Sequence, residues 1–251
     1  MDDPIELGVL VLAGVVAGFV NTFAGGGSML TLPALMLLGL PAEVANGSNR
    51  LAVVAQTLAG VRGFRRAGRL DLADAGPLVA PTMAGAALGA WVAAEVLPRS
   101  WAKPFLLGTM LTMALTMLAA PRVLSPEADR PRSLREQPWA ALALFGAGAY
   151  GGFVQAGVGF VLLAVLGGLL HYDLLRANAL KLTCVLMFGL VALAVFVRAG
   201  QVDWPVAILL AASTVVGAQL GVRFALRVRP RVLRYVVFGG VALSSLGALL
   251  K

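Results

Sequence analysis

The sequence predicts an all-α, polytopic membrane protein, an inverted repeat of two halves with about 8–10 membrane segments, some of them short or broken. Three observations support this fold class. The chain of 251 residues is 59% hydrophobic and only 13% charged, with a mean hydropathy of +0.88, whereas soluble domains carry about a quarter charged residues. Two runs of 36 residues, 7–42 and 137–172, contain no Asp, Glu, Lys or Arg. The two halves of the chain also resemble each other in sequence.

Each charge-free run is too long to be one membrane helix, so each must break and turn. Thirty-six residues of continuous helix would measure roughly 54 Å, against a hydrocarbon core of about 30 Å. We divide the chain into a first membrane repeat (1–120), a cytoplasmic linker (121–136) and a second, inverted membrane repeat (137–251). The apolar segments expected within them are 7–24, 28–40, 43–61, 75–96, 101–120, 137–155, 158–171, 175–197, 204–222 and 235–250.

Two of these segments, 28–40 and 158–171, are shorter than the rest and follow glycine clusters. Short apolar segments interrupted by Gly or Pro, at matching places in two halves, are typical of the substrate site of a transporter. The sequence leaves open whether these two segments cross the membrane or re-enter on the side from which they came.

The repeat is visible at an offset of 132 residues. This offset pairs Gly25 with Gly157, Asn46 with Asn178, and Arg66-Ala67-Gly68 with Arg198-Ala199-Gly200. Matches continue over some seventy positions and include polar residues, which makes chance alignment of small residues a poor explanation. Isolated glycines such as Gly85 and Gly89 are assigned to close helix packing.

The distribution of basic residues predicts the orientation of the repeats. Loops 62–69, 121–136 and 223–234 hold 13 of the 20 basic residues, and basic loops face the cytoplasm. The repeat counterparts of the first and third loops, 194–201 and 91–102, hold one arginine each. The halves are therefore expected to lie upside down relative to each other, with both termini in the periplasm.

Several classes of protein are disfavoured. One His and one Cys cannot build a zinc site, and the sequence contains no P-loop or Rossmann fingerprint. We therefore expect no metal, no cofactor, no enzyme activity and no ATP-driven pumping by this chain alone. The net charge of +8 is explained by the orientation of the membrane spans rather than by nucleic acid.

The stretch GFVNTFAGGGSMLTLPALMLLGLPAEVANGSNRLAVV, the basic loop RRAGRLD that follows it and the second-half copies resemble the TauE/SafE family of sulfite exporters. The resemblance covers nearly the whole chain. It implies a multi-pass protein of the bacterial inner membrane, with seven to ten spans, that exports sulfite or small sulfonated organic anions.

The broken segments are the expected place for such an anion. A break leaves helix ends whose backbone N–H groups and dipole attract anions, and glycine lets a ligand approach the backbone. The same glycines also suit close helix packing. Amides just before each break either bind the anion or satisfy the opened backbone. The residues at and before the breaks are Asn21, Gly25, Gly26, Gly27, Ser28, Gln155, Gly157 and Gly159.

Arg50 and Lys181 are the strongest candidates for anion binding. Each lies inside an apolar segment, and the two are one position apart in the repeat alignment. A cation in the membrane core costs about 2.5–3.5 kcal/mol and so suggests a function. The alternative is that each side chain extends to the membrane surface. Asn46, Ser48, Asn49 and Asn178 would complete the polar shell of the site.

The sequence therefore predicts a secondary transporter that exports a small oxyanion such as sulfite or an organosulfonate. The expected partners are a small anionic substrate and the lipid bilayer, and the sequence leaves open a proton or ion gradient and a homo-oligomer. Two alternatives stay open: an uptake transporter for another small organic anion, and a non-transporting membrane subunit of a larger complex. A structural subunit would not need two buried cations beside broken helices.

Overall fold

The computed structural model describes residues 4–23, 25–70, 72–119 and 130–228, and these residues form helices without any β-strand. Two π-helical stretches, Val92–Val96 and Ala164–Leu169, continue α4 and α7. The all-α membrane fold is confirmed, because four helices are long and apolar enough to cross a bilayer: Pro4–Thr22, Ala75–Val96, Leu174–Arg198 and Trp204–Arg227. The helices are α1 (Pro4–Phe23), α2 (Ser28–Leu37), α3 (Ala42–Arg66), α4 (Leu72–Trp91), α5 (Arg99–Ala119), α6 (Trp139–Phe153), α7 (Val158–Leu163), α8 (Leu174–Arg198) and α9 (Trp204–Arg227).

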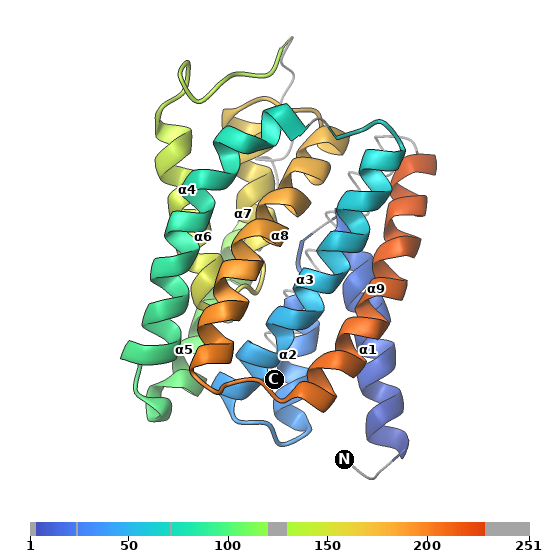
Figure 1. Cartoon of the computed structure of the whole chain (residues 1–251), viewed down its shortest axis with the longest axis vertical. Coiled ribbons are helices and arrows are strands. Elements are labelled where there is room, and N and C mark those ends of the chain that lie inside the picture. Colours follow the sequence, from blue (N-terminus) through green and yellow to red (C-terminus); the bar gives the residue numbers. More distant parts are fainter. Residues whose placement is uncertain (1–3, 24, 71, 120–129, 229–251) are drawn as a thin grey trace.

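Corresponding helices of the two halves run in opposite directions. In Figure 1, α1 and α3 run upward whereas their counterparts α6 and α8 run downward, and α4 runs downward whereas its counterpart α9 runs upward. This is the inverted arrangement that the sequence predicts. The expected segment 235–250 and residues 120–129 of the expected linker lie outside the described residues.

The short segments re-enter rather than cross. α2 has 10 residues, about 15 Å of helix, which is half of the hydrocarbon core. α1 begins at the lower end in Figure 1, and α3 begins at that same end only four residues after α2. α1 and α2 therefore form a hairpin that enters and leaves by one end. The pair α6 and α7 forms the equivalent hairpin from the opposite end.

The helices pack as two bundles that do not coincide with the two halves of the sequence. α9 packs against α1 and α3, and α4 packs against α6 and α8, so each half contributes its fourth helix to the other half's bundle. We call α1, α2, α3 and α9 the first bundle, and α4, α6, α7 and α8 the second bundle. α3 and α8 pack against each other along the seam between them.

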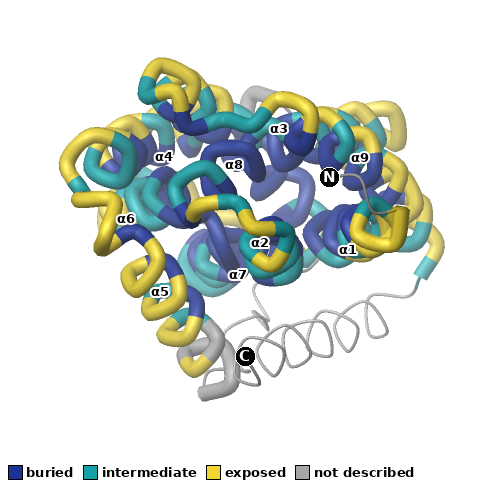
Figure 2. The backbone as a smooth tube through the Cα atoms, turned by 90° about the horizontal axis from the view of Figure 1, so that it is seen from below, coloured by how far each residue is buried: buried dark blue, intermediate teal, exposed yellow. Residues whose placement is uncertain are grey.

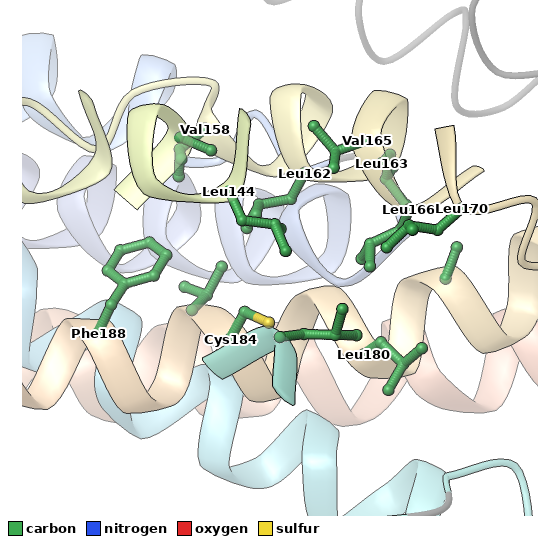
Figure 3. Close-up of a cluster of buried hydrophobic side chains, with 14 of the residues drawn as sticks. Leu144, Val158, Leu162, Leu163, Val165, Leu166, Leu170, Leu180, Cys184 and Phe188 are labelled. Carbon is green, nitrogen blue, oxygen red and sulfur yellow. The ribbon is translucent and has the colours of Figure 1, made fainter. Parts of the chain in front are cut away.

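Each bundle has its own apolar core, as expected for a separate packing unit. The core of the second bundle is formed largely by α6, α7 and α8 (Figure 3) and includes Leu144, Leu162, Leu166, Cys184 and Phe188. The core of the first bundle includes Leu10, Leu35, Ala52, Val206 and Leu210.

Pairs of glycines spaced four residues apart join the swapped helices. Gly85 and Gly89 of α4 face Gly148 and Gly152 of α6, and Gly14 and Gly18 of α1 face Gly217 and Gly221 of α9 across the equivalent crossing. A Cβ atom on Gly89 would lie 1.9 Å from the carbonyl oxygen of Ala149. The assignment of Gly85 and Gly89 to close packing is therefore confirmed, and this is the usual small-residue crossing of membrane helices.

Valine at Gly148 is expected to destabilise the α4–α6 crossing, because a Cβ there would lie 2.1 Å from the backbone oxygen of Thr82. Overpacking costs about 1–3 kcal/mol, which lowers the melting temperature by about 5 °C or more. Gly146→Val is the matched control on the same helix, since nothing lies within 4 Å of that position. Thermal unfolding in detergent measures both; equal melting temperatures would contradict the described crossing.

Two helices extend further than the sequence predicts. The third segment was expected to end at 61 and the ninth at 222, whereas α3 continues to Arg66 and α9 to Arg227. Arginine is a good helix former, and a cation in the last turn interacts favourably with the helix dipole. The arginines of these stretches therefore stand on helices rather than in loops, and α3 is followed by Gly68, whose φ is +67°.

The outer surface and the two ends of the molecule differ in chemistry. The outward faces of the helices are exposed whereas α8 lies at the buried centre (Figure 2), and the exposed faces carry large apolar side chains such as Ile208 and Leu142. Trp91, Trp101, Trp139 and Trp204 are exposed and stand at helix ends, where tryptophan anchors a protein at the membrane surface. Arg62, Arg65, Arg66, Arg69, Arg130, Arg132, Arg135, Arg223 and Arg227 all belong to the upper end in Figure 1.

Candidate functional site

The two helix breaks meet in the centre of the molecule at Gly25 and Gly159. A Cβ atom added to Gly25 would lie 2.4 Å from the Cα atom of Gly159, and one added to Gly159 would lie 2.4 Å from the Cα atom of Gly25. Gly25 also has a φ of +92°, which favours glycine. The crossing of the two hairpins therefore depends on the absence of side chains at both positions.

The other glycines of the clusters also contact protein. A Cβ on Gly27 would lie 2.4 Å from the carbonyl oxygen of Ala17, and one on Gly157 would lie 2.6 Å from Met113 and from Met29. The carbonyl oxygen of Gly26 accepts a hydrogen bond of 3.0 Å from the backbone N–H of Met29 and so starts α2. In this conformation the predicted site glycines serve the turns and the crossing of the hairpins.

Arg50 caps the end of a broken helix from the opposite bundle. It is fully buried on α3, and its guanidinium donates to the carbonyl oxygens of Gly151, Gly152 (2.8 Å) and Phe153 (3.1 Å), the last three residues of α6. The final carbonyls of a helix have no partner within the helix and carry the negative end of its dipole. The guanidinium thus satisfies the backbone that the break opens.

Two predicted side chains complete the surroundings of Arg50. Gln155 accepts from the guanidinium at 2.8 Å and Asn46 at 3.1 Å, while the amide of Asn46 donates to the oxygen of Phe153 at 2.8 Å. The guanidinium carbon lies 5.0 Å from the centre of the Phe196 ring, a cation–π contact. Gln155 has a φ of +69°, an uncommon backbone conformation for a residue with a side chain.

Two N–H donors in this network have no partner. They are Nε of Arg50 and Nε2 of Gln155, both buried. A buried donor without an acceptor costs about 1–3 kcal/mol, and such groups in native proteins usually mark a function or a bound molecule.

Lys181 plays the equivalent part for the other broken helix. Its ammonium group, 1% exposed on α8, donates to the carbonyl oxygens of Asn21 (3.1 Å) and Thr22 (3.2 Å) near the end of α1. Its third hydrogen bond, of 2.9 Å, goes to the side chain of Asn178, whose amide donates to the oxygen of Leu174. All three donors of the lysine are used.

The two cations therefore bridge the seam between the bundles. Arg50 reaches from the first bundle to α6 of the second, and Lys181 reaches from the second bundle to α1 of the first. Each lies seven or eight residues into its helix, about 10–12 Å from the helix start. Because α3 and α8 start at opposite ends (Figure 1), Arg50 is nearer the lower end and Lys181 nearer the upper, arginine-rich end. Both side chains are buried rather than extended to the membrane surface.

The remaining predicted residues do not contact the cations. Asn49 donates to the hydroxyl of Ser28 at 3.1 Å and accepts from Thr31 at 2.7 Å, which fastens the first turns of α2 to α3. Ser48 accepts a hydrogen bond of 2.9 Å from the backbone N–H of Asp203, immediately before α9. These side chains hold the first bundle together.

The sequence did not identify every residue of these networks. Thr31 was missed, although a hydroxyl within a short apolar segment after a glycine cluster is a usable signal. The carbonyl partners of the cations, in Thr22 and in Gly151 to Phe153, are main-chain groups, and no residue type marks them.

A small hollow adjoins the arginine network. Its volume is about 20 Å³, and its lining includes Asn46, Phe153 and Phe196 together with Glu43 and Leu97 near the lower end of the molecule. Such a volume holds about one water molecule. A sulfite-sized anion would need the surrounding helices to separate, so the described conformation is closed on this side.

The centre of the molecule is positively charged. The described residues contain one salt bridge, Arg130–Glu136, on the surface, so no described carboxylate pairs with Arg50 or Lys181. Each helix end supplies only about half an elementary negative charge. About one elementary positive charge is therefore left over for the two sites together, within a region of low dielectric where its effect is strong.

Comparisons with known proteins agree with this arrangement. Residues 10–248 match the family described as "Sulfite exporter TauE/SafE". A "Probable membrane transporter protein" of Haemophilus influenzae is 30% identical over 226 residues, which are 89% of this chain and 87% of the relative. The "Probable membrane transporter protein YfcA" of Escherichia coli K12 is 28% identical over 94% of this chain and 87% of its own length. The "Probable membrane transporter protein ORF9" of a Sinorhizobium species is 29% identical over 95% and 90%.

Proposed function

Because this chain belongs to the TauE/SafE sulfite exporter family and is a membrane transporter, we propose that it is a secondary transporter that exports a small oxyanion, such as sulfite or an organosulfonate. The observation that carries the proposal is the pair of buried cations, Arg50 and Lys181, each of which caps a broken helix without a carboxylate partner. A site of net positive charge in the membrane core favours an anion and repels a cation.

The cations act as two latches between the bundles. The Arg50 latch joins α3 to α6 towards the lower end, and the Lys181 latch joins α8 to α1 towards the upper end. Both are closed in this structure. Opening of the seam at one end releases one cation from its carbonyls, and the oxyanion replaces those carbonyls as its partner. The seam then closes and opens at the other end, as alternating access requires.

The unpaired donors next to Arg50 suit an oxyanion. Nε of Arg50 and Nε2 of Gln155 are buried and lack acceptors, and sulfite and sulfonates carry three oxygen atoms that can accept. Hydrogen bonds from ionised or amide donors to such oxygens are short and strong in a dry site. Gln155 and Arg50 together would therefore select an oxyanion over a halide ion.

We place the arginine-rich end of α3 and α9 in the cytoplasm, because basic residues near membrane spans favour that side. The first helix starts at the opposite end, which puts the amino terminus in the periplasm of a bacterial inner membrane. Substrate would then meet Lys181 first and Arg50 second on its way out.

The test is flux of labelled sulfite and of labelled methanesulfonate out of vesicles that contain the purified protein, with and without a pH gradient. We expect efflux well above that of protein-free vesicles for at least one of the two anions. Efflux that responds to the gradient would identify the coupling ion as a proton. Folded protein that moves neither anion out of vesicles, under either condition, would contradict the proposal, and net inward movement only would favour an uptake transporter.

A further inference from the structure

A groove on the outer surface between the ends of α3 and α9 is separate from the central networks. Its volume is about 720 Å³. The floor is formed where Gly63 allows α9 to approach, since a Cβ on Gly63 would lie 2.8 Å from Val222. α3 and α9 lie side by side in Figure 1 and at the rim of the molecule in Figure 2. The groove therefore opens outward, towards the surrounding lipid.

The chemistry of the groove changes along its length. Both helices run towards the arginine-rich end (Figure 1). The half nearer the membrane centre is lined by apolar residues, among them Ala55, Ala59 and Val215. The outer half is lined by Arg62 and Arg66, one turn apart on α3, and by Gln219 and Arg223, one turn apart on α9.

The three arginines of the groove are not neutralised. Arg62, Arg66 and Arg223 are exposed, and none of the described residues that line the groove is acidic. The salt bridge among the described residues, Arg130–Glu136, involves none of them. The groove thus offers several strong donors for a phosphate group at one end.

We propose that this groove binds one anionic phospholipid, with its phosphate between Arg62, Arg66 and Arg223 and an acyl chain along the apolar half. The order of apolar and basic lining matches the order of acyl chain and headgroup in a leaflet. Basic pockets between membrane helices at the cytoplasmic side are suited to such headgroups. A small soluble anion would use the arginines but would gain nothing from the apolar half.

The test is native mass spectrometry of the full-length protein with dioleoyl-phosphatidylglycerol or dioleoyl-phosphatidylcholine added to the detergent. We expect wild type to retain one phosphatidylglycerol and to prefer it to phosphatidylcholine. The combined variant R62Q/R66Q/R223Q should bind phosphatidylglycerol about 100-fold more weakly, because each basic residue near the surface contributes several-fold to affinity. The matched control is R65Q/R227Q, which removes two neighbouring arginines that do not line the groove, and its affinity should stay within about threefold.

A second variant tests the apolar half without any change of charge. Ala59→Trp fills the groove, and it should weaken phosphatidylglycerol retention about tenfold or more while melting like wild type. Equal losses in R62Q/R66Q/R223Q and in R65Q/R227Q would overturn the proposal, since general charge would then explain the binding. Displacement of the lipid by millimolar inorganic phosphate would indicate a site for free anions instead. A protein dimer that disappears in R62Q/R66Q/R223Q would indicate an interface between copies, and it would equally overturn a lipid site.

Discussion

Alanine at position 50 is expected to reduce anion efflux at least 100-fold while the protein still reaches the membrane. Arg50 donates to three backbone carbonyls at the end of α6 and to the side chains of Asn46 and Gln155. Its removal leaves those carbonyls without donors, at about 1–3 kcal/mol for each unsatisfied group, and takes away the charge that attracts the substrate. Efflux of labelled sulfite from vesicles measures the first effect, and thermal unfolding measures the second.

Matched variants separate the transport role from the structural one. Arg198→Ala removes an exposed arginine from the last turn of α8 and should transport like wild type. Arg50→Lys keeps the charge but has three donors instead of five and lacks the planar fork, so partial stability with strongly reduced efflux is expected. Lys181→Ala should resemble Arg50→Ala. Wild-type efflux in both alanine variants would remove the cations from the mechanism.

Alanine at Gly159 should prevent the hairpins from crossing, and we expect little folded protein and no transport. The added Cβ would lie 2.4 Å from the Cα atom and 2.9 Å from the carbonyl oxygen of Gly25. Both are backbone atoms, so no side-chain rotation can relieve the contact, and the cost is expected to reach or exceed the usual 1–3 kcal/mol of overpacking. The readouts are the yield of monodisperse protein and its melting temperature.

Gly108→Ala is the control for this substitution. Gly108 lies inside α5 with nothing within 4 Å of the added atom, and alanine in a helix is favoured over glycine by up to about 1 kcal/mol. That variant should be as stable as wild type or slightly more so. If Gly159→Ala melts within about 2 °C of wild type, then the two breaks do not touch as described.

Sequence reasoning reached the fold class, the two breaks and the buried cations because each leaves a mark on side chains. The short segments follow glycines, the repeat fixes the opposite directions of the halves, and a lone charge such as Lys181 is conspicuous in an apolar helix. The role of Ser48 was not predictable in this way, because its partner is the backbone of Asp203, 155 residues away. Main-chain acceptors such as those of Gly151 and Gly152 have no residue signature at all.

The packing of the halves was also beyond the sequence. An offset of 132 residues relates α4 to α9, but it does not say which helices they contact. The glycine pairs Gly85/Gly89 and Gly148/Gly152 mark surfaces of close approach, yet many pairings of such surfaces are sterically allowed. Only the three-dimensional arrangement reveals that α4 completes the bundle of α6 and α8, and that α9 completes the bundle of α1 and α3.

This exchange of helices has a consequence for the origin of the molecule. A polypeptide that encoded a single repeat would own three helices of one bundle and the fourth helix of another. It would become complete only by association with a second copy inserted upside down, so its monomer would be expected to adopt both topologies. Fusion of two such copies through a linker would guarantee one of each orientation and free them to diverge. That freedom accounts for an arginine on one side of the axis and a lysine on the other.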